Sequence, residues 1–532
     1  MSTGLVITKH FLKERRKVAA ALGWMVAVVS ISTVYAYRTA YPHLTDRLRL
    51  SASFSHDAGI AAVFGPAHSL ETVAGFTAFR SLAVIPLIIG IWAALTATKA
   101  LRGNEDTGQW EILISAPITR RAATLAALRG IYLSLTMTLV IGSVALSATA
   151  LISHDFKVSA ALFFALALVS SGYLFASIGA VASQLVSTRR TAATITGLVI
   201  GLSFLIRAVA DSSPSIAWVH WFSPLGWITS TAPLTKSHWL GLSLVFATTV
   251  ICTGIAITLS SNRDLTASLI PERISDTNGR EIKSIPRLWV KLQGLNILSW
   301  GAGFFFMSFA FGLVAHGATQ AFSGSSTIQK TFGALGITKM SELFFGIIFL
   351  MLSAGLMFAA NSHAAAFREQ EAEGYIDHLL VSPKSRTQVY LSRLLVSIVG
   401  LTFIALMAGF GAFAGSSLRT GDLGIKDALM AGLNMVPSAM VLFGVSLLVF
   451  GFYPRAVSIV GQSLLAWSFL LELIGSTLKL NHYILDTSFL HHMAFAPAAS
   501  PRGGQNLLLL GIAAVLGLAG LVGFSRRDTA LG

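Results

Sequence analysis

LFFALALVSSGYLFASIGA, residues 162–180, holds nineteen consecutive positions without a charged side chain. As an α-helix, such a run is long enough to cross the hydrocarbon core of a bilayer, which takes about 20 residues. Apolar and polar residues do not alternate along it, as they would in a transmembrane β-strand. The stretch therefore predicts a membrane-spanning helix.

Similar runs recur along the whole chain of 532 residues, which is 54% hydrophobic and 11% charged and has a mean hydropathy of +0.71. A soluble core of this length could not bury so much apolar surface. We therefore predict an all-α polytopic membrane protein with about twelve transmembrane helices. The runs lie at residues 18–37, 78–98, 123–150, 158–186, 191–210, 239–260, 293–315, 342–366, 388–414, 428–452, 455–478 and 506–524.

The net charge of +15 follows the predicted topology. If the N-terminus is cytoplasmic, 25 of the 38 Lys and Arg residues fall in cytoplasmic segments, and the positive-inside rule then places both termini in the cytoplasm. The basic residues form no patch interleaved with aromatics, so a nucleic-acid partner is not expected. The first apolar run is longer than the core of a usual signal peptide, so we interpret it as an uncleaved span. A single cysteine, Cys252, excludes disulfides and thiolate metal sites.

Two charged stretches interrupt the apolar pattern and resemble each other. RGNEDTGQWEILISAPITR (102–120) aligns without a gap on REQEAEGYIDHLLVSPKSR (368–386) at an offset of 266, with six of nineteen positions identical. The identical pairs are Arg102/Arg368, Glu105/Glu371, Gly108/Gly374, Leu113/Leu379, Pro117/Pro383 and Arg120/Arg386. Each half of the chain carries its copy between its second and third runs, which indicates an internal duplication.

Six spans per half is an even number, so the halves are parallel repeats related by an axis along the membrane normal. We expect a first half at 1–263, a cytoplasmic linker with an interfacial helix at 264–292, and a second half at 293–532. A translocation path would lie between the halves. The basic N-terminal HFLKERRK and the end of the linker are also predicted to lie as helices at the membrane surface.

Both copies of the charged stretch predict a short amphipathic helix that a proline ends. One interpretation is a surface helix that only turns the chain. The other is a docking element, because acidic side chains suit a basic protein partner better than anionic lipid. Two copies in a pseudo-symmetric protein favour a partner that is itself a symmetric dimer.

These stretches, together with STRRTAATITGLVIGLSFLIRAVAD from Ser187 and WFSPLGW from Trp221, resemble the type-2 permeases of ABC exporters. The likeness is strongest to the fused double-length permeases of polyketide-antibiotic or multidrug export. It implies that each charged stretch is a coupling helix, which sits in a cleft of the ATP-hydrolysing subunit. The resemblance assigns this role to Glu105, Gly108, Glu111, Pro117, Arg120, Glu371, Gly374, Asp377, Pro383 and Arg386.

The first copy has Asn104, Asp106 and Thr107 where the second has Gln370, Ala372 and Glu373, which leaves open which copy binds the ATPase more tightly. The chain contains no GxxxxGK[ST] motif and so no P-loop. ATP and Mg²⁺ are therefore expected on separate subunits, two copies of a P-loop ABC ATPase. We expect no cofactor, metal or catalytic residue on this chain, which would be a transport subunit and not itself an enzyme.

WVHWFSPLGW, residues 218–227, is predicted to lie outside the membrane between the fifth and sixth spans. It is either an aromatic belt at the outer leaflet or, by the resemblance, a cover over the exit, with Trp218, Trp221, Pro224 and Trp227 as outer gate. Glu472 lies within a predicted span. Because burying a charge there is costly, Glu472 either faces the transport pathway or reaches the membrane edge.

The leading hypothesis is a permease in the bacterial cytoplasmic membrane that exports hydrophobic or amphipathic compounds, such as antibiotics, drugs or lipids, with energy from ATP. The alternative is an ion-coupled secondary multidrug carrier. Such a carrier needs several titratable groups along its path, and the predicted spans hold few.

Overall fold

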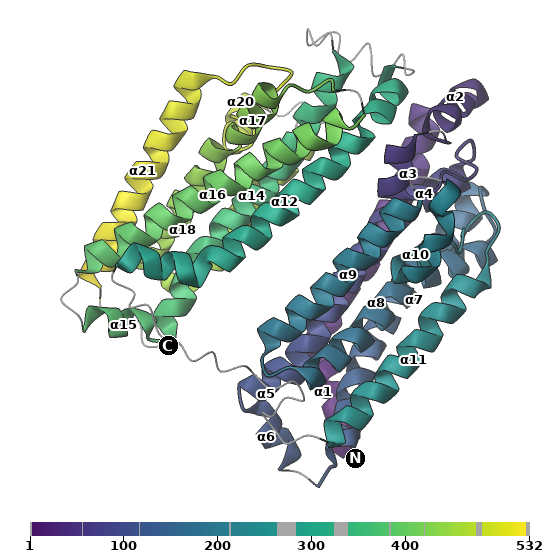
Figure 1. Ribbon diagram of the computed structural model, residues 1–532, viewed down its shortest axis with the longest axis horizontal. Coiled ribbons are helices and arrows are strands. Elements are labelled where there is room, and N and C mark those ends of the chain that lie inside the picture. The colour runs from purple at the N-terminus through teal and green to yellow at the C-terminus, as the bar shows by residue number, and fades with distance from the viewer. Residues whose placement is uncertain are drawn as a thin grey trace. The chain divides into compact units, whose positions relative to one another are not determined.

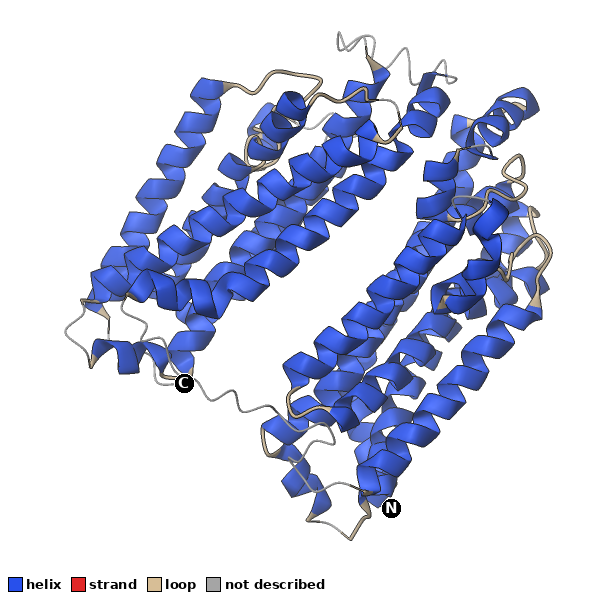
Figure 2. Cartoon of the chain, viewed as in Figure 1, coloured by secondary structure: helices blue, strands red, loops and turns tan. Residues whose placement is uncertain are grey.

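A computed structural model describes residues 3–55, 57–115, 117–211, 214–262, 284–323, 339–381, 385–419, 421–474 and 481–527. Every regular element in these ranges is a helix (Figure 2). Eleven of the described helices are long and apolar enough to cross a membrane. The all-α polytopic prediction is thereby confirmed.

The chain divides into two compact units, Met1–Ser275 and Asp276–Gly532 (purple to teal and teal to yellow in Figure 1). The predicted linker at 264–292 falls at this division, and most of it, residues 264–283, lies outside the described residues. From Ile285 on, the chain belongs to a long helix of the second unit.

The described residues of unit 1 form six long helices and several short ones. The long helices are α1 (Thr3–Ala40), α4 (Val73–Thr98), α7 (Arg120–Ser153), α8 (Val158–Leu185), α9 (Arg189–Asp211) and α11 (Trp239–Ser261). The basic N-terminal segment is continuous with the first span inside α1, so the structure shows no separate helix there. Between α1 and α4 lie two helices that the sequence did not predict, α2 (Leu44–Ser55) and α3 (Ala58–Phe64).

Helix α8 is the most buried span of unit 1 and packs against α4, α7, α9 and α11. Its small residues allow the close approach that apolar helices in a membrane require. A Cβ atom added at Gly172 would lie 2.9 Å from the side chain of Ile89 on α4, and one at Gly179 would lie 3.1 Å from the carbonyl oxygen of Ala94. Helix α1 packs along α7 and also contacts α4.

Unit 2 repeats this arrangement. Its helices are α12 (Ile285–Ser323), α14 (Met340–Ala372), α15 (Tyr375–Leu380), α16 (Arg386–Ser417), α17 (Ile425–Leu433), α18 (Val436–Phe452), η3 (Pro454–Ala456), α19 (Val457–Ile474), α20 (His482–Leu485) and α21 (Gly503–Arg526). Helix α12 packs along α16 and contacts α14, while α18 packs against α14, α19 and α21. These pairings match those of α1, α4, α7, α8, α9 and α11 in unit 1, so the duplication seen in the sequence is also a duplication of packing.

The α12–α16 contact depends on a GxxxG pattern, Gly411 to Gly415. A Cβ atom at either glycine would overlap a backbone carbonyl oxygen of α12, that of Phe305 or that of Phe309. Close packing of this kind is how apolar helices associate inside a bilayer.

Two predicted spans differ in detail from the structure. The run at 428–452 is broken into α17 and α18, with the break just before Pro437, which occupies the first turn of α18. The run at 455–478 corresponds to η3 and α19, and residues 475–480 lie outside the described residues. The described part of α19 is not among the eleven candidate spans.

Candidate functional site

The first charged stretch begins where α4 runs on through a π-helical turn, η1 (Lys99–Gly103), into α5 (Asn104–Asp106). Gly108 then reverses the chain in the left-handed region, at φ 72°, and starts α6 (Gln109–Ile114). Trp110 points back into the protein, is 5% exposed, and donates from Nε1 to the carbonyl oxygen of Ala100 at 3.0 Å. Ile112 on the other face is 75% exposed.

The second stretch has the same construction. Helix α14 ends at Ala372, Gly374 takes the left-handed region at φ 79°, and α15 follows. Ile376, at the position of Trp110, is fully buried, whereas Tyr375 and Val381 are 51% and 88% exposed. Both predicted amphipathic helices are therefore present, each with one buried and one exposed side.

Matching hydrogen bonds set the two reversals. The N–H of Gly108 donates to the carbonyl oxygen of Glu105 at 3.0 Å. The N–H of Gly374 donates to the backbone carbonyl oxygen of Glu371, also at 3.0 Å. A Cβ atom at either glycine would meet nothing within 4 Å. Glycine is thus needed for its backbone conformation and not for lack of space.

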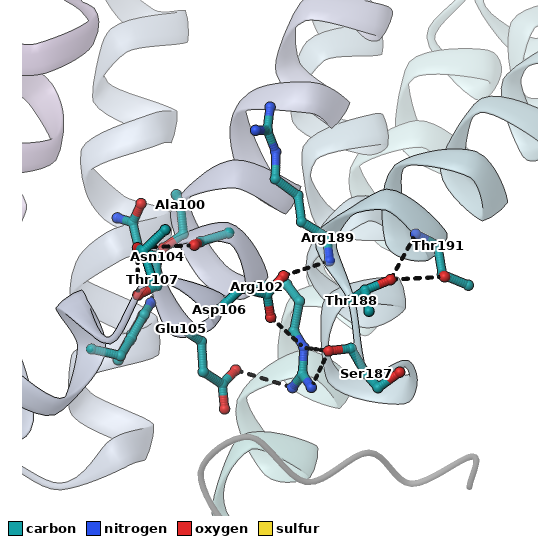
Figure 3. Close-up of polar contacts among 12 residues, drawn as sticks. Ala100, Arg102, Asn104, Glu105, Asp106, Thr107, Ser187, Thr188, Arg189 and Thr191 are labelled. Atoms are coloured by element: carbon teal, nitrogen blue, oxygen red, sulfur yellow. Dashed lines mark hydrogen bonds and ion pairs between the residues drawn. The ribbon is translucent and has the colours of Figure 1, made fainter. Parts of the chain in front are cut away.

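In the first stretch, Glu105 is 7% exposed and forms a buried ion pair with Arg102, which is 1% exposed (Figure 3). Nη1 of Arg102 lies 3.2 Å from the Glu105 carboxylate, and its Nε lies 3.4 Å from that of Asp106. Nε and Nη2 also donate to the carbonyl oxygen of Ser187, at 2.7 and 2.5 Å.

Asp106 extends the network to the start of α9. Its carboxylate accepts the backbone N–H of Arg189 at 2.8 Å. An acid at a helix N-terminus satisfies a donor that has no partner within the helix and also faces the positive end of the helix dipole. Arg102 and Asp106 together therefore join the first stretch to the α8–α9 connection (Figure 3).

In the second stretch, Glu371 is 2% exposed and pairs with Arg527 near the end of the chain. The pair is bidentate, with Nη1–Oε1 and Nη2–Oε2 distances of 2.7 Å. Arg527 also donates to the carbonyl oxygens of Gly451 and Phe450, at 3.1 and 3.3 Å. The first half closes on SNRD (261–264) and the second half on SRRD (525–528), so Arg263 corresponds to Arg527; Arg263 lies outside the described residues.

The structure therefore separates the predicted coupling residues into two groups. Glu105 and Glu371 are buried in internal ion pairs, while Glu111 is exposed and Asp377 is partly exposed. Arg120 and Arg386 are the first residues of α7 and α16, and Arg386 donates to the carbonyl oxygens of Phe524 and Arg527. Pro117 is exposed after α6, and Pro383 lies outside the described residues.

The aromatic segment at 218–227 folds as a 3-10 helix, η2 (Pro214–Phe222), and a short helix, α10 (Pro224–Thr229). Pro224 stands at the first position of α10, where a missing N–H does no harm. Trp218 and Trp221 are 65% and 43% exposed, and Trp227 donates from Nε1 to the carbonyl oxygen of Trp221 at 2.6 Å. Trp218 and Trp221 are thus exposed, whereas Pro224 and Trp227 are partly buried.

A buried polar chain anchors this segment to α9. His220 places Nδ1 2.8 Å from the Asp211 carboxylate and Nε2 2.5 Å from the carbonyl oxygen of Gly226. Arg207, one turn before Asp211, is 2% exposed and donates to the carbonyl oxygen of Val63 at 2.6 Å. Asp211 and His220 also line a cavity of about 510 Å³ next to the segment.

A second anchor was not predicted from the sequence, and it occurs in both units. Ser223 donates to the carbonyl oxygen of Ser203 at 2.6 Å, and Ser203 Oγ accepts the N–H of Leu225 at 2.9 Å. In unit 2, Ser488 donates to the carbonyl oxygen of Ser468 at 3.2 Å, and Ser468 Oγ accepts the N–H of Phe489 at 3.3 Å. The sequence repeat could have indicated this anchor. The two serines of each pair are 20 residues apart, and the two pairs are offset by 265 residues, close to the offset of the charged stretches.

Glu472 lies four residues after Ser468, as Arg207 lies four residues after Ser203. The two units thus place opposite charges at the same point of equivalent helices, α9 and α19. Glu472 is partly buried. Its proposed place in a transport pathway stays a prediction.

A cavity of about 330 Å³ lies between α14 and α19, close to the second charged stretch. Its polar lining comes from Asn361, Ser362, Arg368, Glu369, Ser458 and Gln462. Among the residues that the structure describes, no three His, Cys, Asp or Glu side chains are placed to hold a metal ion.

The chain was compared with known proteins. Residues 284–525 match the family described as the C-terminal domain of the multidrug efflux system permease Rv1217c. Over 534 residues, the chain is 27% identical to the multidrug efflux system permease protein Rv1217c of Mycobacterium tuberculosis (strain ATCC 25618 / H37Rv). That alignment covers 99% of this chain and 95% of the relative.

Proposed function

We propose, on the premise that this chain belongs with the multidrug efflux permeases of the Rv1217c type, that it is the membrane-spanning subunit of an ATP-driven exporter. In this proposal, α6 and α15 are coupling helices, each of which docks on one of two separate P-loop ATPase subunits. The cargo is hydrophobic or amphipathic, and it leaves the cytoplasm or the inner leaflet of the bacterial cytoplasmic membrane.

The observation that carries this proposal is the equivalence of the two charged stretches. Each unit presents one short helix after a glycine reversal, with the same side buried and an exposed apolar residue next to it, Ile112 in one and Val381 in the other. Ile112 and Val381 do not align in the repeat, so the equivalence lies in the shared position and construction of the two helices. Two equivalent interfaces suit two copies of one partner.

Contacts at the chain ends support a common side for the termini and the coupling helices. In unit 1, Gly4 near the N-terminus approaches Ile118, which follows α6. In unit 2, Arg527 near the C-terminus pairs with Glu371. An ATPase in the cytoplasm therefore requires both termini in the cytoplasm, as the positive-inside rule also indicates.

The mechanism follows from differential binding. ATP closes the ATPase dimer, and its closed and open forms bind the coupling helices with different affinity. That difference shifts the permease between inward-open and outward-open states. This chain supplies the docking helices and the passage, and the partner supplies ATP, Mg²⁺ and the hydrolysis step.

The test uses exposed residues, because Glu105 and Glu371 are buried and their replacement would disturb the fold. Ile112→Asp with Val381→Asp should abolish co-purification of the P-loop ATPase encoded nearest to this gene. Leu418→Asp, at the opposite end of α16 and 68% exposed, is the control and should leave it intact. Full ATPase binding by the double variant would refute the docking role of α6 and α15.

A further inference from the structure

The ion pair between Glu371 and Arg527 does more than neutralise a buried acid. Arg527 contacts three elements. Its guanidinium forms an ion pair with Glu371 at the end of α14 and donates to the carbonyl oxygens of Gly451 and Phe450 at the end of α18. Arg527 itself directly follows α21. The backbone carbonyl oxygen of Arg527 also accepts a hydrogen bond from the Arg386 guanidinium on α16. One residue therefore connects four long helices at the end of unit 2 that carries α15.

An aromatic cluster lies against the Arg527 guanidinium. The rings of Phe367 and Phe450 stack at a centroid distance of 4.5 Å, and Phe450 and Phe524 stack at 5.5 Å. The Arg527 guanidinium lies 5.1 Å from the Phe450 ring and 5.5 Å from the Phe524 ring. These rings belong to α14, α18 and α21, so the salt bridge lies over a packed joint between the same helices.

We infer that Arg527 is a positioning residue for energy coupling: it ties the second coupling stretch to α18 and α21, so that a displacement of α15 moves those helices. This inference rests on the proposed function. Glu371 is then an internal attachment point and not a contact for the ATPase. The bidentate geometry matters, because two parallel charge-assisted hydrogen bonds fix orientation as well as distance.

In the described part of unit 1, the first coupling stretch is attached through another arginine. There Arg102 and Asp106 connect the stretch to Ser187 and Arg189, at the α8–α9 connection. The described attachments therefore share the end of α8 and of its counterpart α18, and differ in the second helix, which is α9 in unit 1 and α21 in unit 2. A defect at Arg527 should accordingly impair transmission through unit 2 while leaving the attachment in unit 1 intact.

The experiment uses the full chain with its ATPase in inside-out vesicles and measures two rates, ATP hydrolysis and ATP-dependent uptake of ethidium. Arg527→Met removes the charge but keeps an apolar stem over Phe450 and Phe524. We expect the ATPase to remain bound and to hydrolyse ATP, with ethidium uptake per ATP lowered about tenfold, near the upper end of measured coupling effects. Arg527→Lys, which keeps the charge without the bidentate bond, should recover part of the loss.

Two further variants separate positioning from folding. Glu371→Leu with Arg527→Met replaces the pair by apolar residues, a change that often leaves stability unaffected, so it should fold like the wild type and still couple poorly. Arg526→Ala, at the exposed neighbour of Arg527, is the matched control and should couple normally.

Wild-type uptake per ATP in Arg527→Met or in the double variant would overturn the inference. So would loss of ATPase binding in the double variant, because Arg527 would then only maintain the docking surface. If the wild-type complex itself takes up no ethidium on ATP, the proposed function fails first, and the inference falls with it.

Discussion

Gly108 and Gly374, 266 residues apart, hold the same left-handed backbone conformation at the same point of the two units, with φ 72° and 79°. Each ends a helix that comes out of the predicted membrane region, and each starts the short helix that we assign to coupling. A reversal of this kind needs a residue that accepts positive φ without strain.

Alanine at either glycine should lower stability by about 1–2 kcal/mol, because an L-residue in this region brings its Cβ too close to the carbonyl oxygen. Asparagine should be tolerated better, since it adopts this region more readily. Thermal unfolding in detergent micelles measures the effect. Gly254→Ala in α11 is the control: its Cβ would also meet nothing within 4 Å, but a helical glycine there should gain stability from alanine. Equal effects at Gly108 and Gly254 would contradict the prediction.

Removal of Arg102 should destabilise unit 1 strongly. Arg102→Met leaves the buried Glu105 carboxylate and the Ser187 carbonyl oxygen without this donor, and breaking a buried ion pair costs about 3–5 kcal/mol. Arg190→Met, at an exposed arginine in the first turn of α9, should change stability little. The measurement is the midpoint of thermal unfolding. A midpoint unchanged in Arg102→Met would show that Arg102 does not hold the first coupling stretch.

The serine pairs should hold the 218–227 segment against α9 and the segment around Phe489 against α19. In Ser203→Ala, the N–H of Leu225 loses its acceptor, and an unsatisfied buried donor costs about 1–3 kcal/mol. Backbone hydrogen exchange in the 218–227 segment should become faster, and Ser468→Ala should have the same effect around Phe489. Ser243→Ala, at an exposed serine on α11, serves as control. Unchanged exchange in both variants would mean that other contacts hold the segments.

Glu472→Gln should leave ATP-dependent export working, because the proposed mechanism takes its energy from ATP and needs no proton carrier in the membrane. Export of ethidium from vesicles with a matched ATPase assay tests this. Loss of export with full ATP hydrolysis would instead favour the ion-coupled carrier. The equivalent position in unit 1 carries Arg207, so a shared proton-carrying role for the two positions is not expected.

Much of the fold could be predicted from hydropathy alone, because a long apolar run has few alternatives to a helix in a bilayer. The repeat and the amphipathic character of α6 and α15 could also be predicted from spacing, whereas the left-handed reversals at Gly108 and Gly374 were not predicted. The prediction was incomplete where a helix has no long apolar run and where a proline breaks a run. Residues 44–55 and 58–64 form α2 and α3 without a long apolar run, and the 428–452 run breaks into α17 and α18 near Pro437.

The amino-acid sequence by itself determined that apolar runs form most of the long helices, how the two halves correspond and where each short amphipathic helix lies, since these follow from the order of residues along the chain. Only the tertiary structure decided what the acids of those stretches do. Glu371 meets Arg527 across 156 residues, and Glu105 meets an arginine one helical turn away. The partner of Glu371 depends on how α14, α18 and α21 pack together, which no local pattern records, whereas the pairing of Glu105 with Arg102 is local and only its burial depends on the tertiary structure.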